Sequence, residues 1–294
     1  MGIFKTPLRY PGGKQKLAPF IKEILIENNI SGHYVEPYAG GAGVGLELLL
    51  SGKIDHLHIN DSDFIIYAFW YSVLNKTEEL CKLISTASLT IEEWRRRKEI
   101  IKQCDRRRIL EVGFSAFYLN RCNRSGVLSA GVIGGNDQTG NYKMDARFSR
   151  NDLITRIEAI SRFKDKISIT NFDAEFYIEN YIPNLPSNTL IYFDPPYYEK
   201  GSLLYLNSYK KEDHARLAKV IQQGVKHKWV LSYDGVSDII NLYKKRRHFL
   251  YDLQYSAAKV YKGKEVFIFS DKVKLPEQCS LINIDDGIKQ IVYP

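Results

Sequence analysis

Short apolar runs that end in polar or glycine-rich turns recur along the chain. Each run in the first third is followed by a segment with helical periodicity, and similar runs return in the second half. This alternation predicts a sheet of buried parallel strands joined by helices, with one later hairpin. The fold class that follows is α/β. The expected strands cover residues 33–36, 56–60, 167–170, 189–193, 229–232 and 266–270.

The middle of the chain has a different pattern. A charged helical stretch over residues 91–112 precedes a segment over 120–142 that is rich in glycine, asparagine and arginine. We expect residues 75–163 to be an insertion in the α/β sheet, so that 1–74 and 164–294 form a single domain. A helix followed by a glycine-punctuated hairpin is one device for reading DNA, and a mobile loop is the alternative.

Composition and charge narrow the class of protein. The chain has 42 basic and 34 acidic residues, a net charge of +8 and a pI near 9.1, which favours polyanionic partners. With 44% hydrophobic and 26% charged residues, it is neither a disordered chain nor a disulfide scaffold. Its four cysteines include no Cys-x-x-Cys pair, so we expect reduced thiols and no metal. Because no apolar run approaches the roughly 20 residues of a bilayer span, we expect a cytoplasmic protein without membrane contact.

A glycine-rich turn follows the first expected strand. Glycines let a ligand approach the backbone, and the helix that follows offers unpaired N–H groups. The turn departs from a dinucleotide-binding motif because Leu46 replaces its third glycine, and a turn without a ligand is the alternative. Its residues with expected roles are Glu36, Tyr38, Gly40, Gly41 and Gly43.

An acidic residue, Asp61, ends the second expected strand about 20 residues after the glycine turn, where an acid can accept hydrogen bonds from ribose hydroxyls. This spacing favours a nucleoside as the ligand. The alternative is that Asp61 caps the helix expected over residues 64–73.

The string Asp194-Pro195-Pro196-Tyr197 directly follows a buried apolar run. It therefore places a carboxylate and an aromatic ring at the carboxyl edge of the sheet, where open α/β folds bind ligands. Two prolines hold the backbone extended, so that Asp194 and the Pro195 carbonyl can both accept hydrogen bonds from an exocyclic amine. Tyr197 could then stack on the base that carries the amine.

Near the N-terminus, Tyr10 and Lys14 flank a glycine pair, where Lys14 can meet a carboxylate. This segment is not a P-loop, because an earlier glycine is missing and Gln15 replaces the hydroxyl that would bind Mg²⁺. An ordinary loop is the alternative.

Together these motifs resemble the Dam-like class of N6-adenine DNA methyltransferases over nearly the whole chain. The resemblance implies a Rossmann-like methyltransferase sheet that uses S-adenosylmethionine, with the insertion as a helical and hairpin unit for target recognition. It implies that Tyr10 and Lys14 contact the methyl donor, that the turn from Glu36 to Gly43 and Asp61 bind it, and that Asp173 meets its adenine amine. On sequence alone Asp173 could equally be a helix N-cap.

The same resemblance also implies which residues bind the methyl acceptor. It implies that Asp194 to Tyr197 hold an adenine extruded from duplex DNA, with Asp194 also near the donor, and that no metal takes part. Residues from 119 to 126 resemble the family's Asn/Arg-rich segment and 264 to 266 its closing strand. The expected DNA contacts are Arg121, Asn123, Arg124 and Ser125.

Two other functions remain open. An RNA base methyltransferase would keep the fold and donor, and a catalytically silent nucleic-acid-binding partner of a restriction system would keep only binding. The resemblance also allows a cognate restriction endonuclease as a partner, and we expect a monomer.

Overall fold

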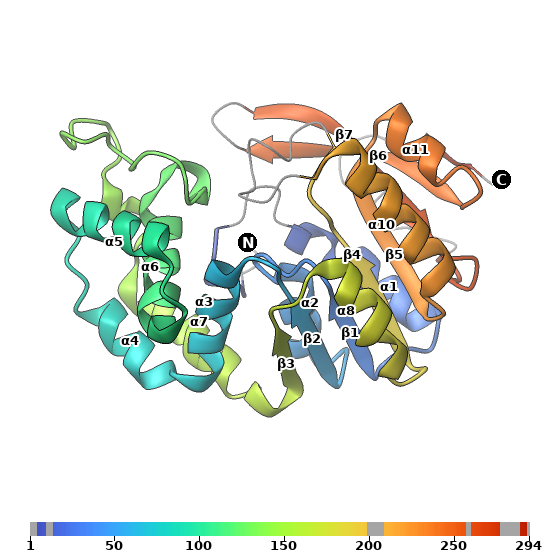
Figure 1. Ribbon diagram of the computed structural model, residues 1–294, viewed down its shortest axis with the longest axis horizontal. Coiled ribbons are helices and arrows are strands. Elements are labelled where there is room, and N and C mark those ends of the chain that lie inside the picture. The colour runs from blue at the N-terminus through green and yellow to red at the C-terminus, as the bar shows by residue number, and fades with distance from the viewer. Residues whose placement is uncertain (1–4, 10–13, 199–208, 257–259, 277–288, 293–294) are drawn as a thin grey trace. The chain divides into compact units, whose positions relative to one another are not determined.

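The structure is a computed structural model that describes residues 5–9, 14–198, 209–256, 260–276 and 289–292. It divides into two compact units, which Figure 1 shows as ribbons. The sheet unit contains Lys14–Ser62 and Phe172–Pro294, and the helical unit contains Met1–Gly13 and Asp63–Asn171. The division at Asp63 and Asn171 lies outside the expected insertion at 75–163, so the helical unit also includes elements that flank it. The functional domain boundaries stay a prediction.

The first half of the sheet is parallel, as the sequence predicts. Strand β1 (His33–Glu36) pairs in parallel with β2 (His56–Asn60) on one side and with β4 (Thr189–Phe193) on the other. Strand β4 then pairs in parallel with β5 (Lys228–Asp234). The strand order therefore extends in opposite directions from the neighbouring strands β1 and β4. This reversal is a topological switch point, where open α/β sheets form their ligand crevice.

The second half of the sheet is antiparallel. Strand β7 (Val260–Phe269) lies between β5 and β6 (His248–Ser256) and runs antiparallel to both. A late hairpin is therefore present, as expected, although no strand was predicted over residues 248–256. Strand β8 (Lys289–Val292) pairs with β6 at the edge. The order within the sheet unit is β2-β1-β4-β5-β7-β6-β8.

Helices cover both faces of this sheet (Figure 1). On one face, α8, α10 and α11 contribute to a core with Val35, Ile191 and Phe193 of the central strands. On the other face, Phe20 of α1 packs against Phe267, with ring centroids 5.1 Å apart. Burial on both faces explains why the strands are nearly continuous apolar runs. The remaining elements are η1 (Lys14–Leu17), α1 (Ala18–Glu27), α2 (Gly43–Leu50), α8 (Ala174–Asn180), η6 (Ile182–Asn184), α10 (Lys211–Gly224) and α11 (Ser237–Leu242).

The helical unit is held together by close packing between α3 and α6. A Cβ on Gly113 would lie 2.4 Å from the Ala68 carbonyl oxygen, so only glycine permits this approach. Phe69 and Phe117 stack beside it with centroids 5.8 Å apart. The elements of this unit are α3 (Phe64–Asn75), α4 (Thr77–Ser85), α5 (Ile91–Gln103), η2 (Arg106–Arg108), α6 (Ile109–Cys122), η3 (Arg124–Gly126), η4 (Met144–Arg147), α7 (Arg150–Ser161), η5 (Lys164–Lys166) and β3 (Ile167–Thr170).

Two details of the insertion differ from the sequence-based expectation. The charged stretch over 91–112 forms α5, the short η2 and the start of α6, because Cys104 has a left-handed backbone conformation, with φ of 47°, that ends α5. Within residues 120–142, which the structure describes fully, the only strand pairing is a single antiparallel bridge between Asn123 and Val132. The expected hairpin is therefore reduced to one bridge.

Within the described ranges, none of the helices combines the length and apolar character that crossing a bilayer requires.

Candidate active site

The candidate site lies at the carboxyl ends of three neighbouring parallel strands of the sheet unit. Strand β1 ends at Glu36, β2 at Asn60 and β4 at Phe193. Since β1 pairs with both β2 and β4, the glycine turn, Asp61 and Asp194 all follow strands that meet at this edge. The sheet thus gathers motifs that are far apart in the sequence.

The glycine turn after β1 has a strained, tightly packed backbone. Gly40 and Ala42 both have positive φ, of 44° and 46°, and helix α2 begins at Gly43. One turn on, the N–H of Gly45 donates to Glu36 Oε1 at 2.7 Å. A Cβ on Gly45 would lie 2.5 Å from the Leu57 side chain, which excludes larger residues there. The backbone conformation of the turn is therefore constrained at Glu36 and at Gly45.

Glu36 is a buried carboxyl group with an unusual pKa. Burial raises the pKa of Glu36 to about 8, against the lowering effect of the hydrogen bond from Gly45, and the negative charge of Asp194 raises it further. At neutral pH the group is therefore largely protonated. A cationic ligand nearby would favour its ionised form.

Asp61 supports the glycine turn. Its Oδ2 accepts a hydrogen bond from the N–H of Gly40 at 2.9 Å. The interpretation of Asp61 as the N-cap of the next helix is wrong, because Asp63 is the N-cap of α3 and accepts from Ile65 N at 2.9 Å. Asp61 is thereby left at the strand end, beside the turn.

Asn60 connects the glycine turn to the segment before α8. Its Nδ2 donates to the carbonyl oxygens of Pro37 and Phe172, both at 3.1 Å, and its Oδ1 accepts from Phe172 N at 2.9 Å. The side chain is completely buried. The sequence analysis gave Asn60 no role, so this connecting role was missed.

Asp173 is the N-cap of α8, as one of its two interpretations proposed. Its Oδ1 accepts from Glu175 N at 3.0 Å and from Phe176 N at 3.2 Å. The residue is exposed, and beside it Phe172 and Phe176 are 40% and 49% exposed, with ring centroids 5.2 Å apart. An exposed acid between two exposed rings can offer both a hydrogen bond and an apolar wall to a planar ligand.

Asp194 lies at the centre of the edge. Its Oδ1 accepts from Ser232 Oγ at 2.8 Å and lies 3.6 Å from Lys14 Nζ, and 22% of the side chain is exposed. Burial raises the pKa of Asp194 to about 6; Lys14 and Ser232 lower it, whereas Glu265 raises it. At neutral pH the group is mainly an ionised acceptor with an open side.

Tyr197 is held from its hydroxyl end. The residue is only 3% exposed, its hydroxyl accepts from Lys14 Nζ at 2.5 Å, and it donates to Glu265 Oε1. Of the two prolines before it, Pro195 is buried and Pro196 is partly exposed. The ring is therefore no open platform in this structure.

Lys14 lies beside Asp194 and Tyr197. Its ammonium group is buried and contacts both oxygens of Glu265 at 2.7 Å. The sequence suggested that Lys14 meets a carboxylate, but it gave Glu265 no role. The available signal was a single acid directly before the apolar run 266–269, because a charge buried in a strand needs a partner. Tyr10, expected beside Lys14, lies outside the described residues.

The Asn/Arg-rich segment of the helical unit is largely structural. Arg121 donates from Nε to Arg147 O at 2.7 Å and from Nη1 to Pro7 O at 3.3 Å, and burial lowers its pKa to about 10. Asn123 is buried, accepts from Trp94 Nε1 at 2.7 Å, and donates to the carbonyls of residues 127 and 128. Their expected contacts with DNA stay predictions.

Two further residues of this segment lie against Arg9, near the N-terminus of the same unit. Asn120 exchanges two hydrogen bonds of 2.7 Å with the backbone of Arg9. Gly126 has φ of 77°, and a Cβ there would lie 2.2 Å from Arg9 O. The motif is thus explained in part by packing, which the sequence interpretation missed.

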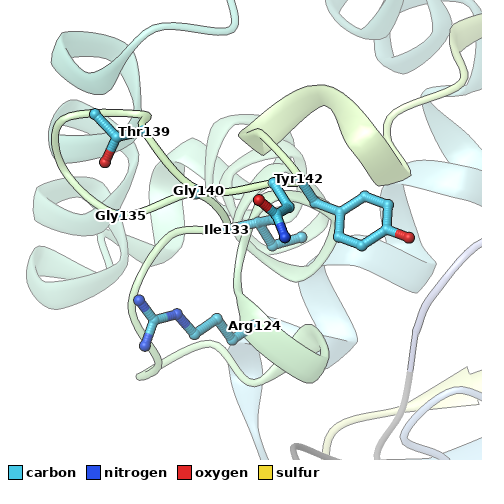
Figure 2. A pocket seen from close by; sticks show the side chains of 8 residues that line it. Arg124, Ile133, Gly135, Thr139, Gly140 and Tyr142 are labelled. Carbon is cyan, nitrogen blue, oxygen red and sulfur yellow. The ribbon is translucent and has the colours of Figure 1, made fainter.

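Arg124 and Ser125 complete the segment. Ser125 has a left-handed conformation with φ of 54°, whereas the side chain of Arg124 is exposed. Arg124 lines an open depression of about 390 Å³ together with Tyr142, which is 69% exposed. Figure 2 shows the guanidinium group on the side of the Gly135 loop, while the Tyr142 ring points the opposite way. Of the four expected DNA contacts, Arg124 is the most accessible.

A Rossmann-like sheet that gathers a glycine turn, a strand-end acid and an Asp-Pro-Pro-Tyr string at one edge is the arrangement of a methyltransferase. The comparison with protein families makes this specific: residues 10–264 match the D12 class N6 adenine-specific DNA methyltransferases. The chain belongs to this family and is an adenine-specific DNA methyltransferase.

Individual relatives are more distant. Type II methyltransferase M.MjaIII of Methanocaldococcus jannaschii is 25% identical over 238 residues, which cover 73% of this chain and 78% of that protein. Among solved structures, the rRNA methyltransferase aviRa from Streptomyces viridochromogenes covers 90% of this chain and 88% of its own, with 12% identity and a TM-score of 0.39.

Proposed function

We propose that this enzyme transfers a methyl group from S-adenosylmethionine to the N6 amine of an adenine that has been extruded from duplex DNA. The observation that carries the proposal is the position of Asp194. It is a partly exposed carboxylate beside the switch point of the sheet, next to the strand that leads into the glycine turn. Asp194, proposed to hold the acceptor amine, and the glycine turn, proposed to bind the methyl donor, therefore lie at the same edge of the sheet.

The residues at this edge fit S-adenosylmethionine. Asp61 would bind the ribose hydroxyls, Asp173 would accept from the adenine amine, and the exposed Phe172 and Phe176 would cover the adenine ring. The raised pKa of Glu36 suits a site that gains a positive charge on binding. When bound, the donor supplies a methyl group that its sulfonium makes electrophilic, so that no metal is needed.

The main task of Asp194 is to orient the target amine. Ionised Asp194 and the Pro195 carbonyl would accept the two N–H groups of the amine and so direct its nitrogen lone pair outward. Because the amine can lose its proton after the nitrogen has become cationic, Asp194 needs no strong basicity. Positioning of this kind can supply roughly 7 to 11 kcal/mol in favourable cases.

Extrusion of the adenine costs a few kcal/mol, and stacking on an aromatic ring is worth roughly 1 to 3 kcal/mol. Tyr197 is the residue proposed to supply this stacking. Because the ring is 3% exposed, we infer that its neighbours move aside when DNA binds.

DNA contacts are assigned to the helical unit. The exposed guanidinium of Arg124 can bind a phosphate or the edge of a guanine. Arg121, Asn123 and Ser125 are proposed to hold the segment that presents it. The D12 relationship and the type II name of the archaeal relative suit a restriction–modification setting. A cognate endonuclease and a monomeric state stay predictions.

Methyl transfer from labelled S-adenosylmethionine to duplex DNA and to structured RNA, followed by nucleoside analysis, tests the proposal. We expect N6-methyladenine in DNA from the wild type and none from Asp194→Ala, which should still bind DNA. Preferential methylation of RNA would support an RNA base methyltransferase instead. Failure of the wild type to bind S-adenosylmethionine would support a silent binding protein.

A further inference from the structure

Glu265 has more polar partners than any role assigned so far requires. It lies on β7, is completely buried, and accepts from Lys14 at 2.7 Å on each oxygen. The hydroxyls of Tyr197 and Tyr251 donate to its Oε1 and Oε2, respectively. The same lysine lies 3.6 Å from Asp194. One carboxylate thus connects to both groups proposed to hold the target base.

The connections are those of a fixed framework. A buried carboxylate is costly unless hydrogen bonds and an opposite charge compensate it, and here both are present. Burial alone would raise the pKa of Glu265, but Lys14 and the two phenols lower it below its usual value. The Lys14 ammonium divides its contacts among Glu265, the Tyr197 hydroxyl and Asp194. Its position therefore depends on where Glu265 holds it.

From this geometry we infer that Glu265 is a positioning residue for methyl transfer, fixing Tyr197 directly and Asp194 through Lys14. This inference rests on the proposed function. Glu265 touches neither the donor nor the base in this role. It sets the orientation of the groups that do.

Removing the charge of Glu265 has a defined consequence. In Glu265→Gln, Lys14 retains only one carboxylate neighbour of this cluster, Asp194, and should move toward it. The Tyr197 hydroxyl loses a charged acceptor and retains at most a weaker, neutral amide acceptor at this position. Asp194 would then be engaged by lysine in place of the amine, so the chemical step should slow more than substrate binding weakens.

Steady-state kinetics of the full chain with duplex DNA test this through the separation of kcat from KM. We expect Glu265→Gln to lower kcat at least tenfold while KM for donor and DNA changes less than threefold. Tyr197→Phe, which keeps the ring, should also lower kcat about tenfold. If Glu265 acts through the Tyr197 hydroxyl and Lys14, the double variant should be about as slow as Glu265→Gln alone. Independent roles would multiply to about 100-fold.

Tyr251→Phe is the matched comparison, because it removes the other phenol from Glu265 without touching Tyr197. Its loss in kcat should be clearly smaller than that of Tyr197→Phe. If Glu265→Gln fails to fold, Lys14→Met/Glu265→Gln removes both charges together and should restore the melting temperature but not the rate. Recovery of the wild-type rate by that neutral pair would overturn the inference.

The outcomes separate this inference from the proposed function. A wild type that forms no N6-methyladenine overturns the proposed function, and with it the role of Glu265. An active wild type whose Glu265→Gln variant keeps its kcat, or loses only donor affinity, overturns the positioning role alone. Multiplicative losses in the double variant do the same.

Discussion

The pH dependence of methyl transfer should report the ionisation of Asp194. Only the ionised carboxylate can accept hydrogen bonds on both oxygens, from Ser232 and from the target amine. Because the pKa of Asp194 is raised to about 6, mainly by burial, the rate should fall about tenfold per pH unit below pH 6 and level off above it. The titratable groups around it include Lys14 on η1, Glu265 on β7 and the carboxyl of Glu36 on β1.

Ser232→Ala should shift the midpoint of this pH–rate profile to higher pH. The hydroxyl of Ser232 donates to Asp194 Oδ1 at 2.8 Å and favours the ionised form. A hydrogen bond to a charged group is worth about 1.5 to 3 kcal/mol, which corresponds to roughly 1 to 2 pKa units at about 1.4 kcal/mol each. The midpoint should therefore rise to between about 7 and 8. At pH 6.5 the variant should be about 3- to 25-fold slower than the wild type, and near pH 9 the two should match.

Single-turnover rates with saturating donor and DNA are the appropriate assay, since saturation removes the effect of Glu36 titration on donor binding. Tyr192→Phe is the control, because its hydroxyl bonds to Ser232 Oγ at 2.7 Å rather than to Asp194. It should shift the midpoint less than Ser232→Ala does. A rate that is flat between pH 5 and 8, or a midpoint that Ser232→Ala leaves in place, would refute this reasoning.

Other predictions concern donor binding, DNA binding and stability. Asp61→Ala should weaken S-adenosylmethionine binding at least about tenfold through lost charged hydrogen bonds, and an unchanged calorimetric affinity would remove Asp61 from the donor site. Arg124→Ala should weaken DNA binding and reduce the slope of log affinity against log salt by about 1 without changing the melting temperature; an unchanged slope argues against a phosphate contact. The pKa of His58 is lowered to about 3, mainly by burial, so the folded state disfavours its protonation. The free energy of unfolding in urea should therefore fall by about 2 kcal/mol as the pH drops from 8 to 5. His58→Phe should flatten this pH dependence. An unchanged slope in His58→Phe would show that another group is responsible.

Local patterns in the sequence predicted the sheet because its strands are buried on both faces. Strands β1, β2 and β4 match the expected runs. Apolar runs of four or five residues bounded by turns are typical of buried strands and are too short for most helices. Strand β6 was missed because its alternating polar residues read less clearly than a continuous apolar run. The break between α5 and α6 depends on the left-handed conformation of Cys104, which the residue type does not predict.

The candidate site was predictable where a residue follows a strand. Asp61 and Asp194 are examples, because parallel strands bring their carboxyl ends to one edge. Pairings across the sheet were not predictable in this way. That Lys14 meets Glu265, 251 residues away, depends on the register of β7 beside β5, which no local pattern encodes. The structural role of Asn123 was not predictable either, because residue type does not show that a polar side chain near a glycine-rich loop donates to backbone carbonyls.

In the proposed mechanism, Asp194 directs methyl transfer to adenine N6 at defined sites in DNA. Single-molecule sequencing of modified bases in DNA from cells that express this chain tests it most directly. We expect N6-methyladenine confined to one short sequence motif with the wild type and absent with Asp194→Ala. Methylation of another base, or an equal level of modified adenine with Asp194→Ala, would contradict the account.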